Sequence, residues 1–561
     1  MRNRIHSHQT PQFIPISMAS SPRRRSSSRD SIIERSENYG RSSSPRDDNR
    51  IFRDDDPVDF SVFESADEVF FNGAIPLTIP KIALKIIPEE PLVSPDVLGS
   101  RINVLLRLIA PSMSSYPDIC ATPTVDIVMV IEVTRNLSDA NLGHLKRVVE
   151  FVIDNLGERD RLSIVYFGTF AKRILPLTLM NEVGRDVARF ALSLMDAQGW
   201  TNIVQGLTMG ARVLEDRYYM NWTTGIIFLS SGRDNCYCSV QDRDSGNGRK
   251  PEYLNLLPIS ICRQRMRPGD PEPPFPVYAF GLGLEHDPIA LHAIASSSGG
   301  TYSFVESYDA LQGAVARCLR GIRNTVAQNC ILRFATTEQL QVVAIFSGRH
   351  PKHLVTDRGE IYIPDIYADE VKDFLVTLEN KRAKKMNICR EVNAFYKYDD
   401  IVSKKRIRLC CSRSIFRPKI HYIKHYVPYL TLIQQRDRLC VAEAIATALS
   451  WFERGEMAQG QEILNQWEQN IVKSKETLME WRLSLAAKHI LSNDTLYEWL
   501  LEDIKEIRAR TESREGYENG GRNYALSFLS CHNVQRATTR SRKLPGAVSA
   551  NAYLAPDVAY K

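Results

Sequence analysis

The chain has 561 residues, with 72 Lys and Arg against 66 Asp and Glu, a formal net charge of +6, and 43% hydrophobic residues. This length exceeds that of one domain, and the apolar content excludes a protein that is disordered throughout. Residues 1–50 alone contain ten Arg, no Lys and five acidic residues, so they account for +5 of the net charge. The remainder is nearly neutral, and we predict no nucleic-acid-binding face there.

The chain shows no secretion or membrane signal. No apolar run of signal-peptide length follows Met1, and no stretch approaches the roughly 18 consecutive apolar residues of a membrane span. The 11 Cys are scattered from Cys120 to Cys531, without the density of a disulfide framework. We therefore expect free thiols, no membrane span, and a cytoplasmic or nuclear location.

Residues 1–58 predict a disordered tail rich in Arg and Ser. Twelve Ser lie within the first 50 residues, and the segment has too few apolar side chains to offset its ordering entropy. Ser26 follows three Arg, while Ser21 and Ser44 each precede Pro. Phosphorylation of these residues is one interpretation, because each phosphate would add about −1.5 to −2 charge. A solvated tail without a switch is the alternative.

Residues 59–118 contain two β-rich runs, LTIPKIALKII at 77–87 and RINVLLRLI at 101–109. The segment is too short to form a core of its own. We expect it to pair with a β region that follows later in the chain.

Residues 119–327 alternate between strand-like and helix-like patterns. Strands are predicted at 125–132, 162–167, 225–229 and 277–280, and helices at 142–155, 183–196, 203–215, 288–296 and 308–325. Such alternation is typical of a parallel sheet with helices on both faces, so we predict a doubly wound α/β domain.

The connection at 235–276 is much longer than the usual 2 to 6 residues between such elements. We expect it at the carboxyl edge of the sheet, where α/β domains place their sites. It contains a small basic cluster, Arg263, Arg265 and Arg267, which would either meet an acidic partner or remain solvated.

The rest of the chain predicts a β part and then an α part. Residues 328–425 carry short strands at 330–335, 341–346, 360–363, 372–378 and 405–409, which indicate a β-sandwich. Residues 426–510 have helical spacing broken at Gly455, which predicts a helical hairpin, with a third helix at 496–507. Residues 511–561 predict a mostly irregular tail.

Three short motifs follow strands of the predicted α/β domain: EVTRN at 132–136, GWTNI at 199–203 and FLSSGRD at 228–234. They resemble the von Willebrand factor A domain, where DxSxS, a Thr and an Asp on three loops form a metal-ion-dependent adhesion site. Hard oxygen ligands there surround Mg²⁺ and leave one octahedral position for a carboxylate of the partner. The matching positions in this chain are Glu132, Thr134, Asn136, Thr201 and Ser231.

Three of these positions depart from the family pattern. Glu132 is one methylene longer than Asp, Asn136 replaces a hydroxyl by an amide, and Ser231 lacks a carboxylate. The formal charge of the site falls from −2 to −1, and Mg²⁺ demands near-ideal geometry. We therefore predict a degenerate site that does not hold Mg²⁺ tightly, with Asp234 nearby as a turn residue and no other cofactor.

Further motifs resemble the plant wavy-growth family of RING-type ubiquitin ligases, in order along most of the chain. They are LGERDRLS at 156–163, GLG at 281–283, HDP at 286–288, GGTY at 299–302, DE at 369–370, DFLV at 373–376, RLCVAEA at 438–444, YALS at 524–527 and QRAT at 535–538. The resemblance implies an E3 ubiquitin ligase with an N-terminal RING, followed by a partner-binding von Willebrand A domain and by β and helical regions.

A RING needs eight Cys or His ligands in paired spacing around two Zn²⁺. Residues 1–119 contain no Cys and only His6 and His8, so no RING can form within them. Elsewhere Cys236 and Cys238, and Cys410 and Cys411, are close pairs without C-x2-C spacing. We do not expect either pair to bind a metal.

Other catalytic templates are not matched. Gly281-Leu282-Gly283 is too short for a dinucleotide-binding loop and predicts a tight turn. His286-Asp287 has the composition of an acid–base pair, but Asp before Pro288 at the start of a helix predicts a cap. We therefore assign no catalytic residue.

The leading hypothesis is a protein-interaction module related to these ligases. It would bind ubiquitination substrates or RING-bearing relatives, without ligase activity of its own. One alternative is a full RING ubiquitin ligase whose gene model is truncated at its first exon. A metal-dependent ligand-binding module is the other alternative.

Overall fold

A computed structural model describes residues 52–58, 79–89, 101–116, 123–197, 199–236, 253–262, 275–337, 340–348, 350, 352–355, 357–380, 390–415, 430–484, 495–539 and 553. The predicted phosphorylation sites in the first 50 residues, the basic cluster at 263–267, and most of the long connection at 235–276 lie outside these residues. The elements from β1 onward belong to one unit.

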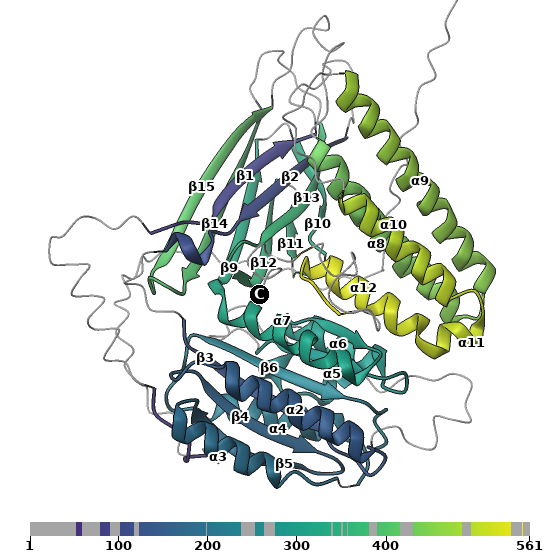
Figure 1. The fold of residues 1–561 in the computed structure, drawn as a ribbon. Helices are drawn as coiled ribbons and strands as arrows, with labels where there is room; N and C mark the ends of the chain where they lie inside the picture. The colour runs from purple at the N-terminus through teal and green to yellow at the C-terminus, as the bar shows by residue number, and fades with distance from the viewer. Residues whose placement is uncertain are drawn as a thin grey trace, which may run out of the picture. The chain divides into compact units, whose positions relative to one another are not determined.

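The α/β part is a six-stranded sheet with helices on both faces (Figure 1). Its strands are β3 (Val125–Glu132), β4 (Arg161–Phe167), β5 (Ala171–Leu179), β6 (Thr223–Ser230), β7 (Val277–Leu282) and β8 (Tyr302–Val305). Its helices are α2 (Asp139–Asn155), α3 (Glu182–Ser193), α4 (Ile203–Glu215), α5 (Tyr253–Leu256), α6 (Pro288–Ser298) and α7 (Leu311–Arg323). The strand order is β5-β4-β3-β6-β7-β8, and only β5 runs antiparallel to its neighbour.

The predicted doubly wound fold is therefore confirmed, with an antiparallel edge strand that the sequence analysis does not include. The central strand β3 is buried along its whole length, which explains its nearly continuous run of apolar residues. β5 contains Pro176, which a central strand would not tolerate but an edge strand does.

Residues 52–58 lie along this edge, which corrects the prediction that the disordered tail extends to residue 58. The backbone N–H of Asp56 donates to the carbonyl of Leu177 at 2.8 Å, and the carboxylates of Asp55 and Asp56 accept from the N–H groups of Leu177 and Leu179. Arg173 forms ion pairs with Asp54 and Asp55. The acidic run therefore covers an edge strand that would otherwise present unpaired backbone groups.

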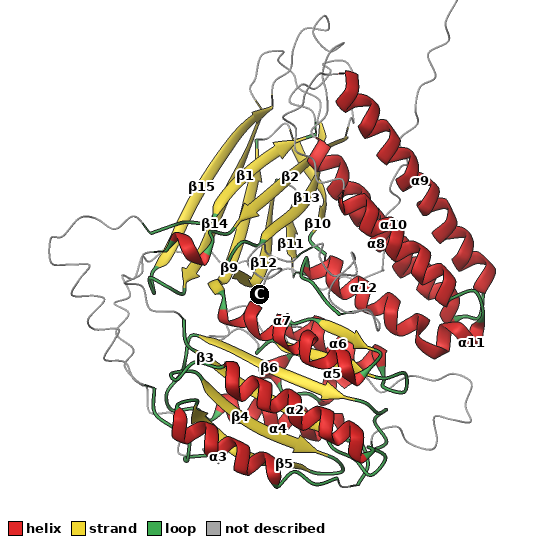
Figure 2. Cartoon of the chain, in the orientation of Figure 1, coloured by secondary structure: helices red, strands yellow, loops and turns green. Residues whose placement is uncertain are grey.

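The β part consists of two antiparallel sheets, yellow in Figure 2, which enclose a shared core. One has the order β1-β2-β13-β10, formed by β1 (Ala83–Pro88), β2 (Arg101–Ile109), β13 (Val371–Asn380) and β10 (Leu340–Phe346). The other has the order β11-β12-β9-β14-β15, formed by β11 (Lys352–Val355), β12 (Arg358–Tyr367), β9 (Thr325–Thr336), β14 (Arg390–Asp400) and β15 (Arg406–Ile415). β2 pairs with β13, so the early β segment and the later β region share one sheet.

The α part begins with the hairpin of α8 (Leu430–Glu453) and α9 (Met457–Ser484), separated by Gly455 at φ +87°. α10 (Thr495–Arg510), the short α11 (Arg514–Gly516), a π-turn at Tyr517–Gly521 and α12 (Arg522–Val534) follow. The prediction that 511–561 is mostly irregular is therefore wrong for residues 514–534.

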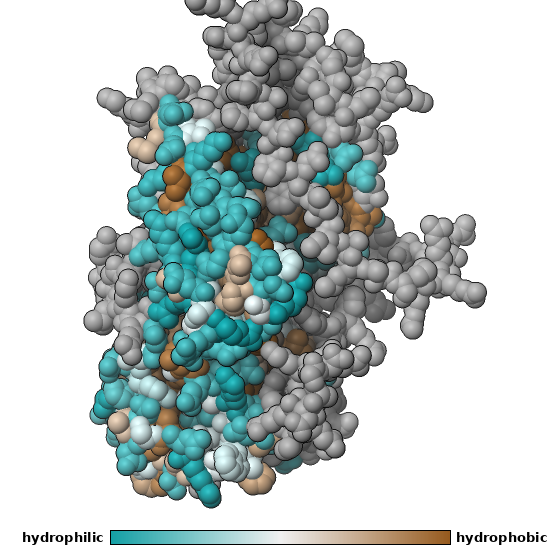
Figure 3. Space-filling view, turned by 90° about the vertical axis from the view of Figure 1, so that its right-hand side faces the viewer, coloured by the Kyte–Doolittle hydropathy of each residue, from teal (hydrophilic) through white to brown (hydrophobic). Residues whose placement is uncertain are grey.

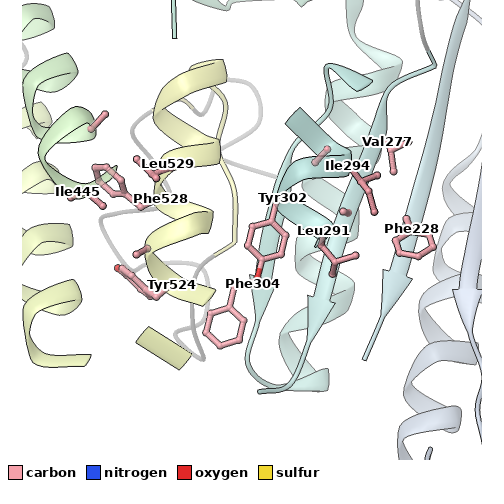
Figure 4. Close-up of a cluster of buried hydrophobic side chains, with 14 of the residues drawn as sticks. Phe228, Val277, Leu291, Ile294, Tyr302, Phe304, Ile445, Tyr524, Phe528 and Leu529 are labelled. Carbon is pink, nitrogen blue, oxygen red and sulfur yellow. The ribbon is translucent and has the colours of Figure 1, made fainter. Parts of the chain in front are cut away.

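Helix α12 lies between the helical hairpin and the α/β domain. Figure 4 shows its Tyr524, Phe528 and Leu529 between Ile445 of α8 and Tyr302 and Phe304 of β8. The apolar core on the α4 and α6 face of the α/β sheet and the core of the helical part therefore form one continuous cluster. This arrangement removes both faces of α12 from water, and no amphipathic stripe marks the helix in the sequence.

The segment after α12 connects the helical part, to which it belongs, with the β part and the α/β part. Arg536 is buried, and its guanidinium contacts Glu370 (Nε to Oε1, 2.7 Å) and Asp365 (Nη1 to Oδ1, 3.3 Å) and stacks 3.6 Å from the Tyr367 ring centroid. The Gln535 amide pairs with the backbone of Asp373, donating at 2.8 Å and accepting at 2.9 Å. On the other side, the Phe304 N–H donates to the Thr539 carbonyl at 3.0 Å.

None of the described helices is both long enough and apolar enough to span a membrane. The face drawn in Figure 3 is largely hydrophilic among the described residues, with apolar side chains in small groups.

We expect Arg536→Gln to lower the free energy of unfolding by about 3–5 kcal/mol, because it removes the guanidinium that pairs with the buried carboxylates of Asp365 and Glu370. Urea unfolding followed by circular dichroism measures this loss. Arg333→Gln is the matched control, since its pair with Glu360 is largely exposed, with Arg333 58% accessible. It should cost less than about 1 kcal/mol. Equal losses in both variants would refute the role assigned to Arg536.

His286 makes stability depend on pH. Its ring is fully buried between the Gly283 carbonyl (2.9 Å) and the Tyr302 hydroxyl (2.7 Å), and burial lowers its pKa from 6.5 to about 4. The unfolded state therefore takes up a proton at a higher pH than the folded state, so stability falls as the pH drops below 6.5. We expect a loss of about 2 kcal/mol between pH 7 and pH 5 from this residue. In urea titrations, His286→Gln should flatten that slope.

Candidate functional site

The predicted metal-site residues meet at the carboxyl edge of the α/β sheet. β3 and its parallel neighbours all end there, and Glu132 is the last residue of β3. Thr134 follows on the next loop, Thr201 precedes α4, and Ser231 follows β6. The fold thus brings Glu132, Thr134, Thr201 and Ser231 together, as the spacing of the motifs predicts.

The Glu132 carboxylate is buried, with 2% of the residue exposed, and it accepts hydrogen bonds on both oxygens. Oε1 accepts from Thr201 Oγ1 at 2.6 Å and from Thr134 Oγ1 at 3.4 Å. Oε2 accepts from Ser230 Oγ at 2.7 Å, Ser231 N at 2.8 Å and Gly232 N at 3.0 Å. A buried carboxylate needs such partners, and five donors from three loops supply them here.

The extra methylene of Glu132 explains this arrangement. It extends the carboxylate to the backbone N–H groups at the end of β6. A Cβ at Gly232 would lie 2.6 Å from Thr201 Oγ1 and 2.7 Å from Glu132 Oε1, so this close approach requires glycine. The length of Glu132 and the absence of a side chain at Gly232 therefore allow donors of the protein itself to hydrogen-bond both oxygens of the carboxylate.

Asn136 and Ser231 have different positions. Asn136 is exposed in the turn before α2. Ser231 is half-buried and interacts with Tyr308, whose pKa is raised by burial. Tyr308 lies in the 3-10 turn at Tyr308–Ala310, directly before α7, so this contact links the site to that helix.

Asp234 does not join the cluster as a replacement ligand. Its Oδ2 accepts from the Ile203 N–H at the start of α4 (3.0 Å), and its Oδ1 accepts from the Cys236 N–H (2.9 Å). The predicted turn role is correct, with the addition that Asp234 is buried and holds the β6 loop against α4. Among the described residues, no group of three or more His, Cys, Asp or Glu side chains is placed to bind a metal ion.

The sequence analysis misses three participants: Ser230, Gly232 and Tyr308. Ser230 and Gly232 flank the predicted Ser231 in the same motif, so the motif itself is the available signal. Tyr308 is 77 positions from Ser231 in the numbering of the chain, and nothing in the sequence connects them.

Two large aromatic side chains are exposed at the same edge. Phe170, in the turn between β4 and β5, is 80% exposed, and Trp200, next to Thr201, is 60% exposed. The Trp200 N–H donates to Thr169 Oγ1 at 2.9 Å, and the Arg135 N–H donates to the Gly199 carbonyl at 3.4 Å. The loops are thus tied to one another while these two rings face solvent.

The remaining motifs have structural roles. Asp287 caps α6, because its Oδ1 accepts from the N–H groups of Ile289 and Ala290 at 3.0 Å, with Pro288 in the first turn. Gly283 has φ +67° in the predicted tight turn. Cys410 and Cys411 are consecutive on β15, so their side chains point to opposite faces. Cys238, of the other Cys pair, lies outside the described residues.

Comparison with known proteins assigns two regions. The family described as "von Willebrand factor type A domain" matches residues 126–317, and the family described as "VWA / Hh protein intein-like" matches residues 494–553. The second match covers α10 to α12 and the segment with Arg536.

Among curated proteins, the chain is 26% identical over 344 residues to "Probable E3 ubiquitin-protein ligase WAVH2" of Arabidopsis thaliana, covering 59% of this chain and 43% of that protein. It is also 26% identical over 292 residues to "E3 ubiquitin-protein ligase WAV3" of the same plant, covering 51% of this chain and 34% of that protein. The chain thus spans less than half of these relatives.

A solved structure, "von Willebrand factor type A from Catenulispora acidiphila", superimposes with a TM-score of 0.57 at 14% identity, covering 84% of this chain and 99% of that one. At this identity the match concerns the fold alone, and its extent includes the β and helical parts. This chain therefore contains a von Willebrand factor type A domain and is homologous to the WAV E3 ubiquitin-protein ligases of Arabidopsis.

Proposed function

We propose that this chain is a protein-interaction module of the ubiquitin pathway. Its von Willebrand A domain binds a ubiquitination substrate or a RING-bearing relative, in the cytoplasm or nucleus, and the module does not transfer ubiquitin itself. The names of the relatives support the pathway. Residues 1–119 contain no Cys and only two His, too few zinc ligands for a RING. This supports the proposal that this region does not transfer ubiquitin.

The observation that carries the metal-independent part of this proposal is the Glu132 carboxylate. Its oxygens already accept five hydrogen bonds, and Thr134 and Thr201, whose hydroxyls would be the ligands of a Mg²⁺ ion, donate to it. A partner carboxylate that approaches this edge would meet Glu132 without an intervening cation, which is repulsive. Recognition there has to use other contacts, and the exposed Phe170 and Trp200 are of the residue type that dominates protein interfaces.

The metal dependence is testable by calorimetric titration of the full chain with Mg²⁺ and Mn²⁺. We expect no binding in the micromolar range. The triple variant Glu132→Asp, Asn136→Ser and Ser231→Asp restores the family pattern, so it should gain binding because the site recovers two carboxylates and a hydroxyl.

The control for this experiment is Thr201→Ala in the triple variant, which should lose the gained affinity. Micromolar binding by the native chain that disappears in Thr201→Ala would instead establish the metal-dependent ligand-binding module.

The ubiquitin-pathway role is testable with purified chain, E1, E2 and ubiquitin. We expect no ubiquitin chains from this protein alone. Full-length WAVH2 or WAV3 should co-purify with it, or should ubiquitinate a target that the chain captures. Robust chain formation without any relative would refute the proposal and favour a complete ligase.

The interface is testable through its aromatic side chains. Trp200→Ser should weaken binding of the captured partner at least tenfold, since truncation of a central aromatic contact costs about 2 kcal/mol or more. Phe395→Ser is the matched control, because Phe395 is 50% exposed on β14 in the other part of the unit. Equal affinities for the Trp200→Ser and native proteins would remove this edge from the interface.

A further inference from the structure

A second site lies away from the Glu132 cluster, where all three parts of the unit meet. It is a pocket of about 70 Å³ between α7, the β7 and β8 strands, the turn between β12 and β13, and the segment after α12. A buried water needs about 10–15 Å³ on this scale, so the pocket has space for roughly five waters or one small organic molecule. One face of α7 forms a wall, with Ala314, Arg317, Cys318 and Gly321.

Arg317 brings a positive charge into this pocket without an acidic partner. Its side chain is half-buried, and its Nη2 donates to Thr539 Oγ1 at 2.7 Å. A guanidinium has five N–H donors. Among the described residues Arg317 makes no ion pair, and burial lowers its pKa, which shows that desolvation is not offset by a neighbouring carboxylate.

The carboxylates nearby are already engaged. Glu370, which also lines the pocket, accepts from Arg536 Nε at 2.7 Å and lies 3.2 Å from Lys372 Nζ. Asp365 accepts from Arg536. Asp365 and Glu370 are thus compensated by Arg536 and Lys372, which leaves the positive charge of Arg317 in excess at the junction.

The rest of the lining defines the ligand. The lining includes the apolar residues Phe280, Ala314 and Ala368, the aromatic residues Tyr278 and Tyr367, and the hydroxyl-bearing Ser303 and Thr301. A single excess charge matches a carboxylate of charge −1 better than a phosphate, which carries about −1.5 to −2. A planar guanidinium also fits the two oxygens of a carboxylate.

We propose that this pocket binds a small organic carboxylate with a flat apolar body, whose carboxylate pairs with Arg317 and whose body lies against the tyrosine and phenylalanine rings. The ligand contacts α7, the β12–β13 turn and the segment after α12 at once. Binding therefore stabilises the junction of the three parts. This site is independent of the partner-binding edge and of the proposed function.

The test titrates the full chain with benzoate, with acetate and inorganic phosphate in parallel arms at equal ionic strength. Thermal unfolding and ligand-observed saturation-transfer NMR are the two measurements. We expect benzoate to raise the unfolding midpoint in a saturable way, acetate to act more weakly because it lacks the flat body, and phosphate to have no effect. Arg317→Gln should weaken benzoate binding at least about tenfold through loss of charge-assisted hydrogen bonds.

Arg320→Gln is the matched control on the same helix, outside the pocket lining, and should bind benzoate as the native chain does. Because Arg317→Gln could lower stability by itself, Arg317→Lys is measured beside it. Lys keeps the positive charge but lacks the paired N–H groups that bind both oxygens of a carboxylate, so we expect an intermediate affinity for benzoate. Stabilisation by phosphate alone, equal benzoate affinity in Arg317→Gln and the native chain, or no saturable binding to the native chain would each overturn the proposal.

Discussion

A short segment after α12 holds the unit together, and its central interaction is the buried Arg536 guanidinium. Arg536 compensates two carboxylates of the β part, while Gln535 pairs with the β13 backbone and Thr539 pairs with β8. Each partner is more than 150 residues away in the sequence from the segment. A buried guanidinium is costly unless its partners are in place, so the contact favours one arrangement of the three parts over a set of looser ones.

The carboxyl edge of the α/β sheet uses the same principle on a smaller scale. Glu132 would be an expensive buried charge, and donors from the loop after β3, from the end of β6 and its loop, and from the loop between α3 and α4 offset this cost. The carboxylate therefore organises the loops that meet at this edge. Loops that are fixed before a partner arrives lose little conformational entropy on binding, which favours affinity.

The sequence predicts the parts of this protein whose burial leaves a simple pattern, and it fails where burial is two-sided or polar. β3 and β6 are apolar runs, and Glu132, Thr201 and Ser231 follow from motif spacing. β14 was missed although Asn393, Lys397 and Asp399 alternate with its buried residues, which is the period of a half-buried strand. α12 was missed because its Ser, Asn and His side chains are buried between two cores, so no apolar stripe forms. Contacts such as Tyr308 with Ser231 depend on the tertiary fold alone.

Helix α7 connects the two sites physically. Directly before it, Tyr308 interacts with Ser231 at the Glu132 cluster, and from its middle Arg317 donates a hydrogen bond to Thr539 in the segment after α12. Gly321, near its end, allows Tyr367 to approach, since a Cβ there would lie 2.6 Å from that ring. A displacement of α7 would have to break these contacts together. The helix is therefore a fixed element between the Glu132 cluster and the junction of the three parts.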